Sequence, residues 1–249
     1  MKSRHPILLG IVLCLTMICD GPIALAQTQH WRGPNQNGNF GPGDFPSSLN
    51  KSTLKWKTPL PGKGTSTPVL VQNNIFLTCP ADGKDSVISF DRNGKELWRQ
   101  NLGSEVAGKH RNGSGSNASV ATDGNLLFTY FKSGTLAGLN LKGELLWKHN
   151  LIERYGPDTL YWDHGTSPVV TSSGVVMVRM HEGESWLASF DKQTGKLQWK
   201  IPRNFDTPRE GDHGYTSPIL THLEGEEVLL LWGGQHLTAH NPADGSIVW

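Results

Sequence analysis

The chain has 249 residues, with 23 Lys and Arg residues against 22 Asp and Glu residues, and its formal net charge is +1 at pH 7. This near-neutral balance argues against nucleic acid or an anionic membrane surface as the main partner, because both select basic proteins. The length is sufficient for one substantial apolar core.

The first 26 residues are predicted to be a secretory signal peptide. A basic start, an apolar run and an Ala-x-Ala cleavage site follow one another: Lys2, Arg4 and His5, then Ile7 to Ile18, then Ala24 to Ala26. A membrane anchor is the alternative, but the apolar run is too short to cross about 30 Å of hydrocarbon. We therefore expect an exported protein, periplasmic or extracellular after cleavage near Ala26, with no membrane span in the mature chain.

Cleavage at this site would leave a single cysteine. Cys14 and Cys19 lie within the signal peptide, and Cys79 lies beyond it. Lipidation of Cys19 is rejected because the bulky Ile18 stands where a small residue is expected. An exported chain with one cysteine forms no internal disulfide, so packing must hold the fold together.

Residues 27–52 are predicted to form an N-terminal strap rich in Gly, Pro and Asn. Its central part reads "HWRGPNQNGNFGPGDFP" at 30–46. We expect an ordered, extended segment that is held in place by Trp31 and carries no chemistry of its own.

Two markers recur over residues 53–249 with a period near fifty. The first is "SFDRNGKELW", "GLNLKGELLW", "SFDKQTGKLQW" and "AHNPADGSIVW", which places Trp98, Trp147, Trp199 and Trp249 at intervals of 49, 52 and 50 residues. The second marker runs in step with it as "STPVL" at 66–70, "NASVA" at 117–121, "TSPVV" at 166–170 and "TSPIL" at 216–220. A shared period of this length indicates a repeat architecture.

Each repeat contains four short β-type runs. In the third repeat these are Ser167–Thr171, Val175–Met180, Trp186–Phe190 and Leu197–Ile201, with turn residues between them. Four antiparallel strands per repeat, without helices, predict an all-β fold, a β-propeller with blades at about 64–103, 113–152, 163–203 and 213–249. A solenoid of similar period would need a helix or a much shorter strand unit in each repeat.

The repeated tryptophan is predicted to be a structural docking residue. A blade must pack both faces of its sheet on its neighbours, and an indole covers about 200 Å² while its N–H can reach a neighbouring backbone carbonyl. Trp56 in "LKWKTPL" at 54–60 belongs to the same set, although no three strands precede it.

Ser189 to Trp199 resembles the tryptophan-docking motif A-x-D-x-x-T-G-x-x-x-W, with Ser in place of Ala. This motif is typical of the PQQ-repeat (pyrrolo-quinoline quinone-like, quinoprotein-type) β-propeller family, and the resemblance covers about residues 53–249. It implies an exported bacterial propeller with about eight blades, of which four are present here. The family includes quinoprotein dehydrogenases, outer-membrane assembly lipoproteins and non-catalytic propellers.

The segment at 54–60 is predicted to be an outer strand that closes the last blade of a ring. Four blade units and this single strand do not complete an eight-bladed ring. We therefore expect the sequence to be a fragment of a longer chain. A half-ring that dimerises is the alternative.

The long connections between blades are predicted to gather at one rim of the propeller, where binding residues usually lie. They contain the candidate rim residues His110, Asp163, His164, Asp212 and His213, and the last four belong to a repeated Asp-His-Gly. Neutral imidazole can ligate a metal, and an adjacent carboxylate could orient it. The favoured alternative is a repeated turn, in which Asp accepts backbone N–H bonds and His bonds within the blade.

The repeats show no convergent set of acid, base and nucleophile, which favours a non-catalytic binding or assembly scaffold with a protein or small-molecule ligand at the loop-rich rim. Tyr161 and Trp162 could stack on a ligand there, although packing against a neighbouring loop is the favoured interpretation. The resemblance implies two alternatives: a PQQ-dependent quinoprotein oxidoreductase with PQQ and Ca²⁺, or a propeller similar to outer-membrane protein assembly factors. Cys79 alone cannot supply the adjacent cysteine pair of the dehydrogenases, and the assembly factors usually carry a lipid anchor.

Overall fold

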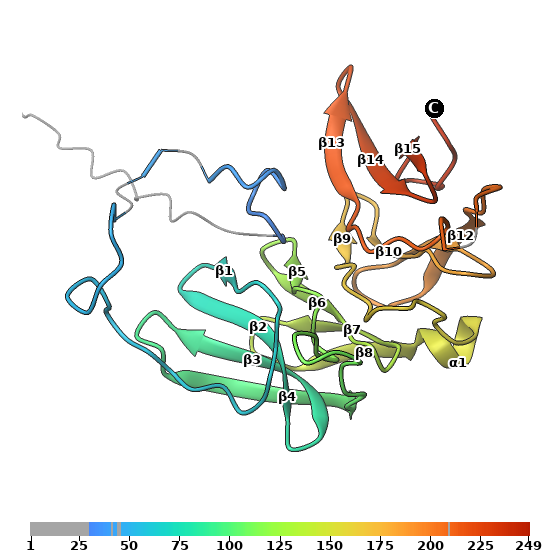
Figure 1. Ribbon diagram of the computed structural model, residues 1–249. Coiled ribbons are helices and arrows are strands. Elements are labelled where there is room, and N and C mark those ends of the chain that lie inside the picture. Colours follow the sequence, from blue (N-terminus) through green and yellow to red (C-terminus); the bar gives the residue numbers. More distant parts are fainter. Residues whose placement is uncertain (1–29, 41, 44–45, 209) are drawn as a thin grey trace, which may run out of the picture.

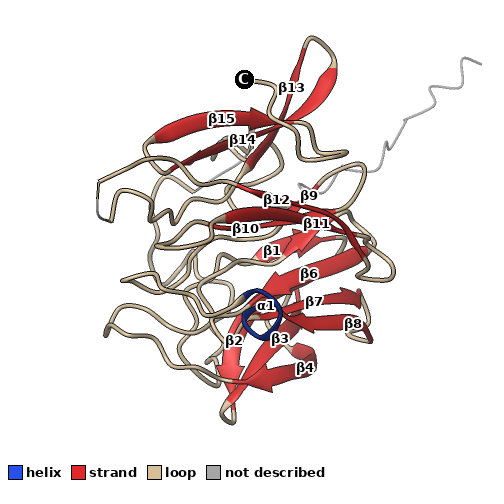
Figure 2. Cartoon of the chain, turned by 90° about the vertical axis from the view of Figure 1, so that its right-hand side faces the viewer, coloured by secondary structure: helices blue, strands red, loops and turns tan. Residues whose placement is uncertain are grey.

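The computed structural model describes residues 30–40, 42–43, 46–208 and 210–249, so the predicted signal peptide lies outside the described residues. Their strands form four antiparallel sheets that stand side by side (Figure 1) and follow one another through the molecule as successive layers (Figure 2). Within each sheet the strands are ordered as they are in the chain. This arrangement confirms the predicted all-β propeller fold.

The sheets are named blades 1 to 4. Blade 1 contains β1 (Val69–Val71), β2 (Asn74–Ala81), β3 (Lys84–Asp91) and β4 (Glu96–Ser104). Blade 2 contains β5 (Ala121–Thr122), β6 (Leu126–Tyr130), β7 (Thr135–Asn140) and β8 (Leu145–Asn150). Blade 3 contains β9 (Val169–Val170), β10 (Val175–Arg179), β11 (Trp186–Phe190) and β12 (Leu197–Pro202). Blade 4 contains β13 (Ile219–Leu223), β14 (Glu226–Gly233) and β15 (His236–His240).

The apolar core lies between consecutive blades. One buried cluster joins Phe76 of blade 1 to Leu139 of blade 2, a second joins Phe128 of blade 2 to Phe190 of blade 3, and a third joins blades 3 and 4. The inner and central strands of blades 2 and 3 are therefore buried on both faces, which explains why β6 and β11 are apolar along most of their length.

At the perimeter, four tryptophans contact the blade that follows them in the chain, three from outer strands and Trp56 from the segment at 54–60. The indole Nε1 atoms of Trp56, Trp98, Trp147 and Trp199 donate to the backbone oxygens of Arg92, Leu141, Lys192 and Pro242, at 2.6, 3.1, 2.9 and 3.1 Å. Each indole lies on a glycine of that turn, namely Gly94, Gly143, Gly195 or Gly245, and all four glycines have positive φ. Trp249 is exposed, and its carbonyl oxygen accepts a bond from the Ala239 backbone N–H.

Near the inner strands, the second sequence marker forms a ladder from blade to blade. The backbone N–H of Thr67 donates to Ser119 Oγ at 2.8 Å, that of Ser119 donates to Ser167 Oγ at 2.9 Å, and that of Ser167 donates to Ser217 Oγ at 2.8 Å. The marker therefore ties the inner ends of the blades together, as the tryptophans tie the outer ends.

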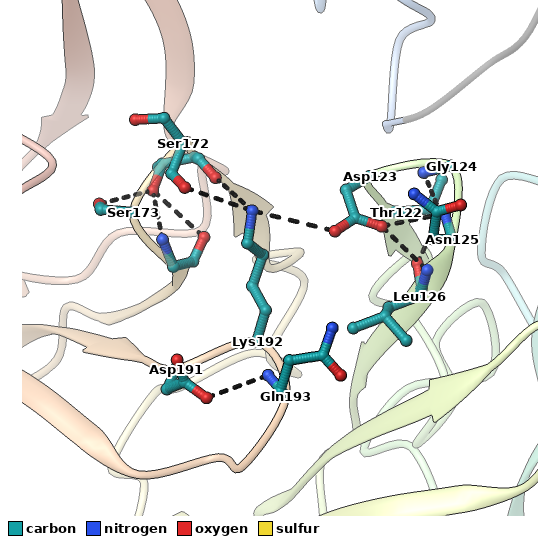
Figure 3. A network of polar contacts seen from close by, with 12 residues as sticks. Thr122, Asp123, Gly124, Asn125, Leu126, Ser172, Ser173, Asp191, Lys192 and Gln193 are labelled. Carbon is teal, nitrogen blue, oxygen red and sulfur yellow. Dashed lines mark hydrogen bonds and ion pairs between the residues drawn. The ribbon is translucent and has the colours of Figure 1, made fainter.

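The short turns at the end opposite the long loops are also linked between blades (Figure 3). The ammonium group of Lys192 donates to the backbone oxygens of Thr171 and Ser172, both at 3.3 Å, and lies 3.9 Å from the Asp123 carboxylate of blade 2. Ser172 in turn bonds the Glu227 carboxylate of blade 4. These contacts join the turns of blades 2 and 3 to each other and connect them to blade 4.

Three segments differ from the sequence-based expectation. A short helix, α1 (Leu151–Tyr155), follows β8, although no helix was predicted there. Residues 54–60 form no strand ladder among the described residues, although Trp56 is docked on blade 1. The N-terminal strap forms turns over 31–38 and is held by Gln36, whose side-chain oxygen accepts from the Leu220 backbone N–H at 3.2 Å, while Trp31 is 42% exposed.

Candidate functional site

The long connections between blades lie at the end of the sheets where each outer strand finishes. They are the loops at 105–120, 151–168 and 203–218, together with the turns that join the second and third strands. We call this end of the molecule the loop face. One hollow on this face lies between blades 2 and 3.

The loop at 151–168 is anchored at its start by a capped helix. Asn150 Oδ1 accepts from the backbone N–H groups of Ile152 and Glu153, which is the usual role of an N-cap residue. At the C-terminal end of this helix, the buried guanidinium of Arg179 donates to the backbone oxygens of Tyr155 at 2.6 Å and Gly156 at 2.8 Å. Blade 3 therefore fixes the point from which the rest of the loop departs.

Asp158 and His164 form an ion pair at the base of this loop. Asp158 Oδ2 lies 3.4 Å from His164 Nδ1, and Asp158 Oδ1 accepts from the Leu160 backbone N–H at 2.9 Å. Burial acts to raise the pKa of Asp158, but His164 and the Leu160 bond outweigh it and lower the pKa to about 2. The imidazole of His164 donates through Nε2 to the Thr166 carbonyl and packs edge-on against Tyr130, whose pKa is raised by burial.

Asp163 points away from its neighbour His164 and toward two lysines. Its carboxylate accepts from the Lys109 backbone N–H at 2.8 and 3.0 Å and lies 2.6 Å from Lys132 Nζ. Lys132 Nζ also donates to the Ala107 carbonyl at 2.6 Å, so Asp163 and Lys132 neutralise each other between two loops.

These residues enclose a cavity of about 210 Å³. Its walls combine polar and apolar side chains: Val106, Lys109, Lys132, Ile152, Pro157, Asp158, Leu160, Trp162, Asp163 and His164. Both carboxylates in the wall already have a partner in the chain, Lys132 for Asp163 and the His164 imidazole for Asp158. The cavity can therefore accept a small apolar group more readily than a charged one.

A second group of histidines lies toward blade 4. His181 accepts through Nδ1 from the Thr159 backbone N–H at 3.1 Å and donates through Nε2 to the Glu184 carbonyl at 2.9 Å, which is the pattern of a neutral imidazole. Burial lowers its pKa in agreement with this pattern. Asp212 Oδ1 and His213 Nε2 lie 4.0 Å apart, beyond hydrogen-bond distance.

The five candidate rim residues do not converge. His110 is exposed, accepts from the Asn112 backbone N–H at 3.2 Å and lies with its ring 6.0 Å from that of Trp162. Asp163 faces the lysines, His164 faces Asp158, and Asp212 with His213 lies near blade 4. In the part of the chain that the structure describes, no three His, Cys, Asp or Glu side chains are placed to hold a metal ion together.

Asp158, His181, Lys109 and Lys132 are functional candidates that the sequence did not indicate. Lys132 belongs to a short turn, and Asp158 follows a helix of five residues, so neither lies in a repeated marker. Their importance follows from the three-dimensional meeting of loops, which no local spacing records.

Two aromatic residues project from the loop face beside the cavity. Tyr161 and Trp162 are 62% and 53% exposed, and their rings meet edge to face at 4.9 Å. The backbone that carries them is held from both sides, because Lys109 Nζ donates to the Leu160 and Tyr161 carbonyls, and Tyr215 Oη accepts from the Trp162 N–H at 3.1 Å. The backbone therefore packs against neighbouring loops, and the Trp162 ring meets the His110 ring of one of them, while more than half of each aromatic residue stays exposed.

Comparison with known proteins adds sequence and fold relationships. An outer membrane protein assembly factor BamB from Burkholderia pseudomallei is 27% identical over 189 residues, which cover 76% of this chain and 42% of the relative. A quinohemoprotein alcohol dehydrogenase from Comamonas testosteroni matches with a TM-score of 0.53 at 15% identity, covering 76% of this chain and 34% of the enzyme. BamB from Moraxella catarrhalis matches with a TM-score of 0.51 at 15% identity, covering 78% and 53%.

The chain thus spans between about a third and a half of the length of these relatives, and the structural matches establish the fold alone. No helix among the described residues has the length and apolar character needed to cross a membrane. The sequence profile of the family described as outer membrane protein assembly factor BamB matches residues 48–249. The chain therefore belongs to the BamB family of PQQ-repeat β-propellers.

Proposed function

We propose that the protein is an exported, non-catalytic scaffold that binds a protein partner through its loop face during assembly of outer-membrane proteins. The observation that carries the proposal is the exposed Tyr161–Trp162 pair on a braced backbone. Aromatic side chains held in place before binding lose little conformational entropy, and such residues dominate the energy of many interfaces. Family membership supports assembly as the setting, because the family profile and the Burkholderia pseudomallei relative are both described as outer membrane protein assembly factor BamB.

The cavity beside these aromatics suits a partner's apolar side chain. Its volume of about 210 Å³ is of the size of one such group, and Trp162 forms part of its wall. A partner segment would then cover the exposed rings and insert one residue into the cavity. The paired carboxylates Asp158 and Asp163 would stay paired, so binding would carry no cost for separating buried charges.

Site-specific photo-crosslinking in the native host tests this proposal. A photoreactive residue at Trp162 should crosslink to a protein of the outer-membrane assembly machinery, while the same residue at Lys142 should not. Lys142 is exposed in a turn at the end of the blades opposite the loop face, so it controls for random encounters. Equal crosslinking from both positions, or none from position 162, would contradict the proposal.

The alternative is a PQQ-dependent oxidoreductase, and the loop-face cavity fits this cofactor poorly. A cavity of about 210 Å³ is smaller than a typical ligand pocket, which has about 300–1,000 Å³. Its two lysines are already bonded to backbone carbonyls and to Asp163, so they are not free to pair with the carboxylates of PQQ. Quenching of tryptophan fluorescence by PQQ with Ca²⁺, or dye-linked alcohol oxidation, would favour the enzyme instead.

A further inference from the structure

A second hollow, of about 590 Å³, lies between blades 1 and 2, and Val106 lies in the wall of both hollows. Its walls come from the end of β4, the turn before β7, and the region where β8 passes into α1, and most of the lining side chains are polar. Gly103, Ser133 and Thr135 form the part of the wall that matters here. We call this hollow the blade 1–2 groove.

Asp85 lies directly behind this wall and is completely buried. It is paired with Gly103 across the β3–β4 ladder, and a register shift between Asp85 and Ser86 changes the direction of the strand at this point. Asp85 Oδ2 accepts from Ser133 Oγ at 2.5 Å, and Ser133 Oγ lies 2.8 Å from Thr135 Oγ1. Asp85 Oδ1 has no hydrogen-bond donor among the described residues.

Glycine at position 103 keeps this space open. A Cβ atom at Gly103 would lie 2.7 Å from Thr135 Oγ1 and 3.4 Å from Asp85 Oδ2. Any larger residue would therefore press against the hydroxyl and the carboxylate. The glycine leaves the hydroxyl groups of Ser133 and Thr135 at the bottom of the groove, with the Asp85 carboxylate directly behind Ser133.

Among the residues that the structure describes, no cationic side chain forms an ion pair with Asp85. Glu105, which acts on it electrostatically, is itself an acid, and the nearby Lys148 donates its ammonium group to the Leu102 carbonyl at 2.7 Å. The pKa of Asp85 is raised to about 6. Burial and the nearby Glu105 raise it, and the hydrogen bond from Ser133 partly offsets this increase. At neutral pH the side chain is thus mostly ionised, and a buried carboxylate without a cation is costly.

We propose that the Asp85 carboxylate and the hydroxyl groups of Ser133 and Thr135 bind a hard cation at the bottom of the blade 1–2 groove. All three donors are oxygen atoms, which Ca²⁺, Mg²⁺ and the alkali cations prefer over softer metals. The donors are one carboxylate and two hydroxyls, so water in the groove completes the coordination shell. The cation would tie the β3–β4 ladder of blade 1 to the turn before β7 of blade 2.

Thermal unfolding of the purified protein at pH 7.5 tests the site, after EDTA has stripped divalent cations and dialysis has removed the EDTA together with Na⁺ and K⁺. CaCl₂, MgCl₂, KCl and NaCl are added separately, with choline chloride keeping the ionic strength constant. At least one hard cation should raise the Tm of the wild type by a few degrees above the choline control. A rise in Tm with Ca²⁺ or Mg²⁺ would identify a site for a divalent cation, and a rise with K⁺ or Na⁺ would identify a site for an alkali cation.

Two variants locate the effect. Asp85→Asn should abolish the cation-dependent rise in Tm, whereas Asp82→Asn, which changes an exposed acid just before β3, should keep it. If Asp85→Asn does not fold, Thr135→Val provides the measurement, and its affinity for the active cation should fall at least about tenfold by calorimetry. The proposal is overturned if no cation exceeds choline with the wild type, or if Asp85→Asn responds like the wild type.

Discussion

Substitution of Gly195 by Ala measures how much the tryptophan docking contact contributes to stability. Gly195 has a φ of 68°, and a Cβ atom there would lie 2.5 Å from Trp147 Cδ2 and 2.7 Å from Cε3 and Cγ. The ring, which is 7% exposed, would have to move and would lose its 2.9 Å bond to the Lys192 carbonyl. The positive φ costs about 1 kcal/mol, the lost bond about 1 kcal/mol, and the displaced indole about 1 kcal/mol more.

Gly83 provides a matched control for this experiment. Its φ is 70°, but a Cβ atom there would meet nothing within 4 Å. Gly83→Ala should therefore cost only about 1 kcal/mol, against about 3 kcal/mol for Gly195→Ala. Urea unfolding followed by tryptophan fluorescence and circular dichroism gives both values. Equal losses in the two variants would refute the claim that the indole–glycine contact stabilises the blade pair.

Three further predictions concern buried charges. Because the pKa of Asp158 is lowered to about 2, Asp158→Asn should cost about 2 kcal/mol at neutral pH, and the difference from wild type should vanish as the pH falls from about 4 to 2 in urea titrations. The pKa of Asp85 is shifted upward, so its effect on stability runs in the opposite direction with pH. In EDTA, the free energy of unfolding of the wild type should fall by about 3 kcal/mol relative to Asp85→Asn as the pH rises from about 4 to 7. A difference between the two proteins that does not change with pH would contradict the assignment. Arg203 is buried and donates to the carbonyls of Leu231, Gly233 and His236, so Arg203→Met should cost about 2–4 kcal/mol in urea unfolding and increase hydrogen exchange over β14 and β15; a loss below about 1 kcal/mol would show that these bonds contribute little.

The fold could be predicted well from the sequence because each blade repeats the same short strand and turn patterns. In blade 3 the two central strands, β10 and β11, lie on the predicted runs to within one residue. Short, mostly apolar runs bounded by turn residues encode these hairpins directly, without help from distant residues. The helix α1 was missed because five residues are too few to show a helical period, and its capping by Asn150 depends on a single side chain.

The candidate site could be predicted only in part. The sequence located the loops correctly, but it grouped residues by a shared Asp-His-Gly pattern, and the structure turns Asp163 and His164 in different directions. The residues that meet at the cavity, such as Asp158 and Lys132, come from different loops and share no motif. Their arrangement depends on the curvature of the blades, which is a property of packing between sheets.

The ties between neighbouring blades have a geometric consequence. The serine ladder joins each pair of sheets close to the axis, and the indole contact joins the same pair at the perimeter. A single contact would let one sheet rotate relative to the next. Two contacts at different distances from the axis fix the angle between neighbouring sheets. Because blades 1 to 4 repeat the same pair of ties, curvature is decided at each step by nearest neighbours and adds up along the arc. A change in the length of either tie would therefore alter the radius of the whole assembly by a small amount at every joint.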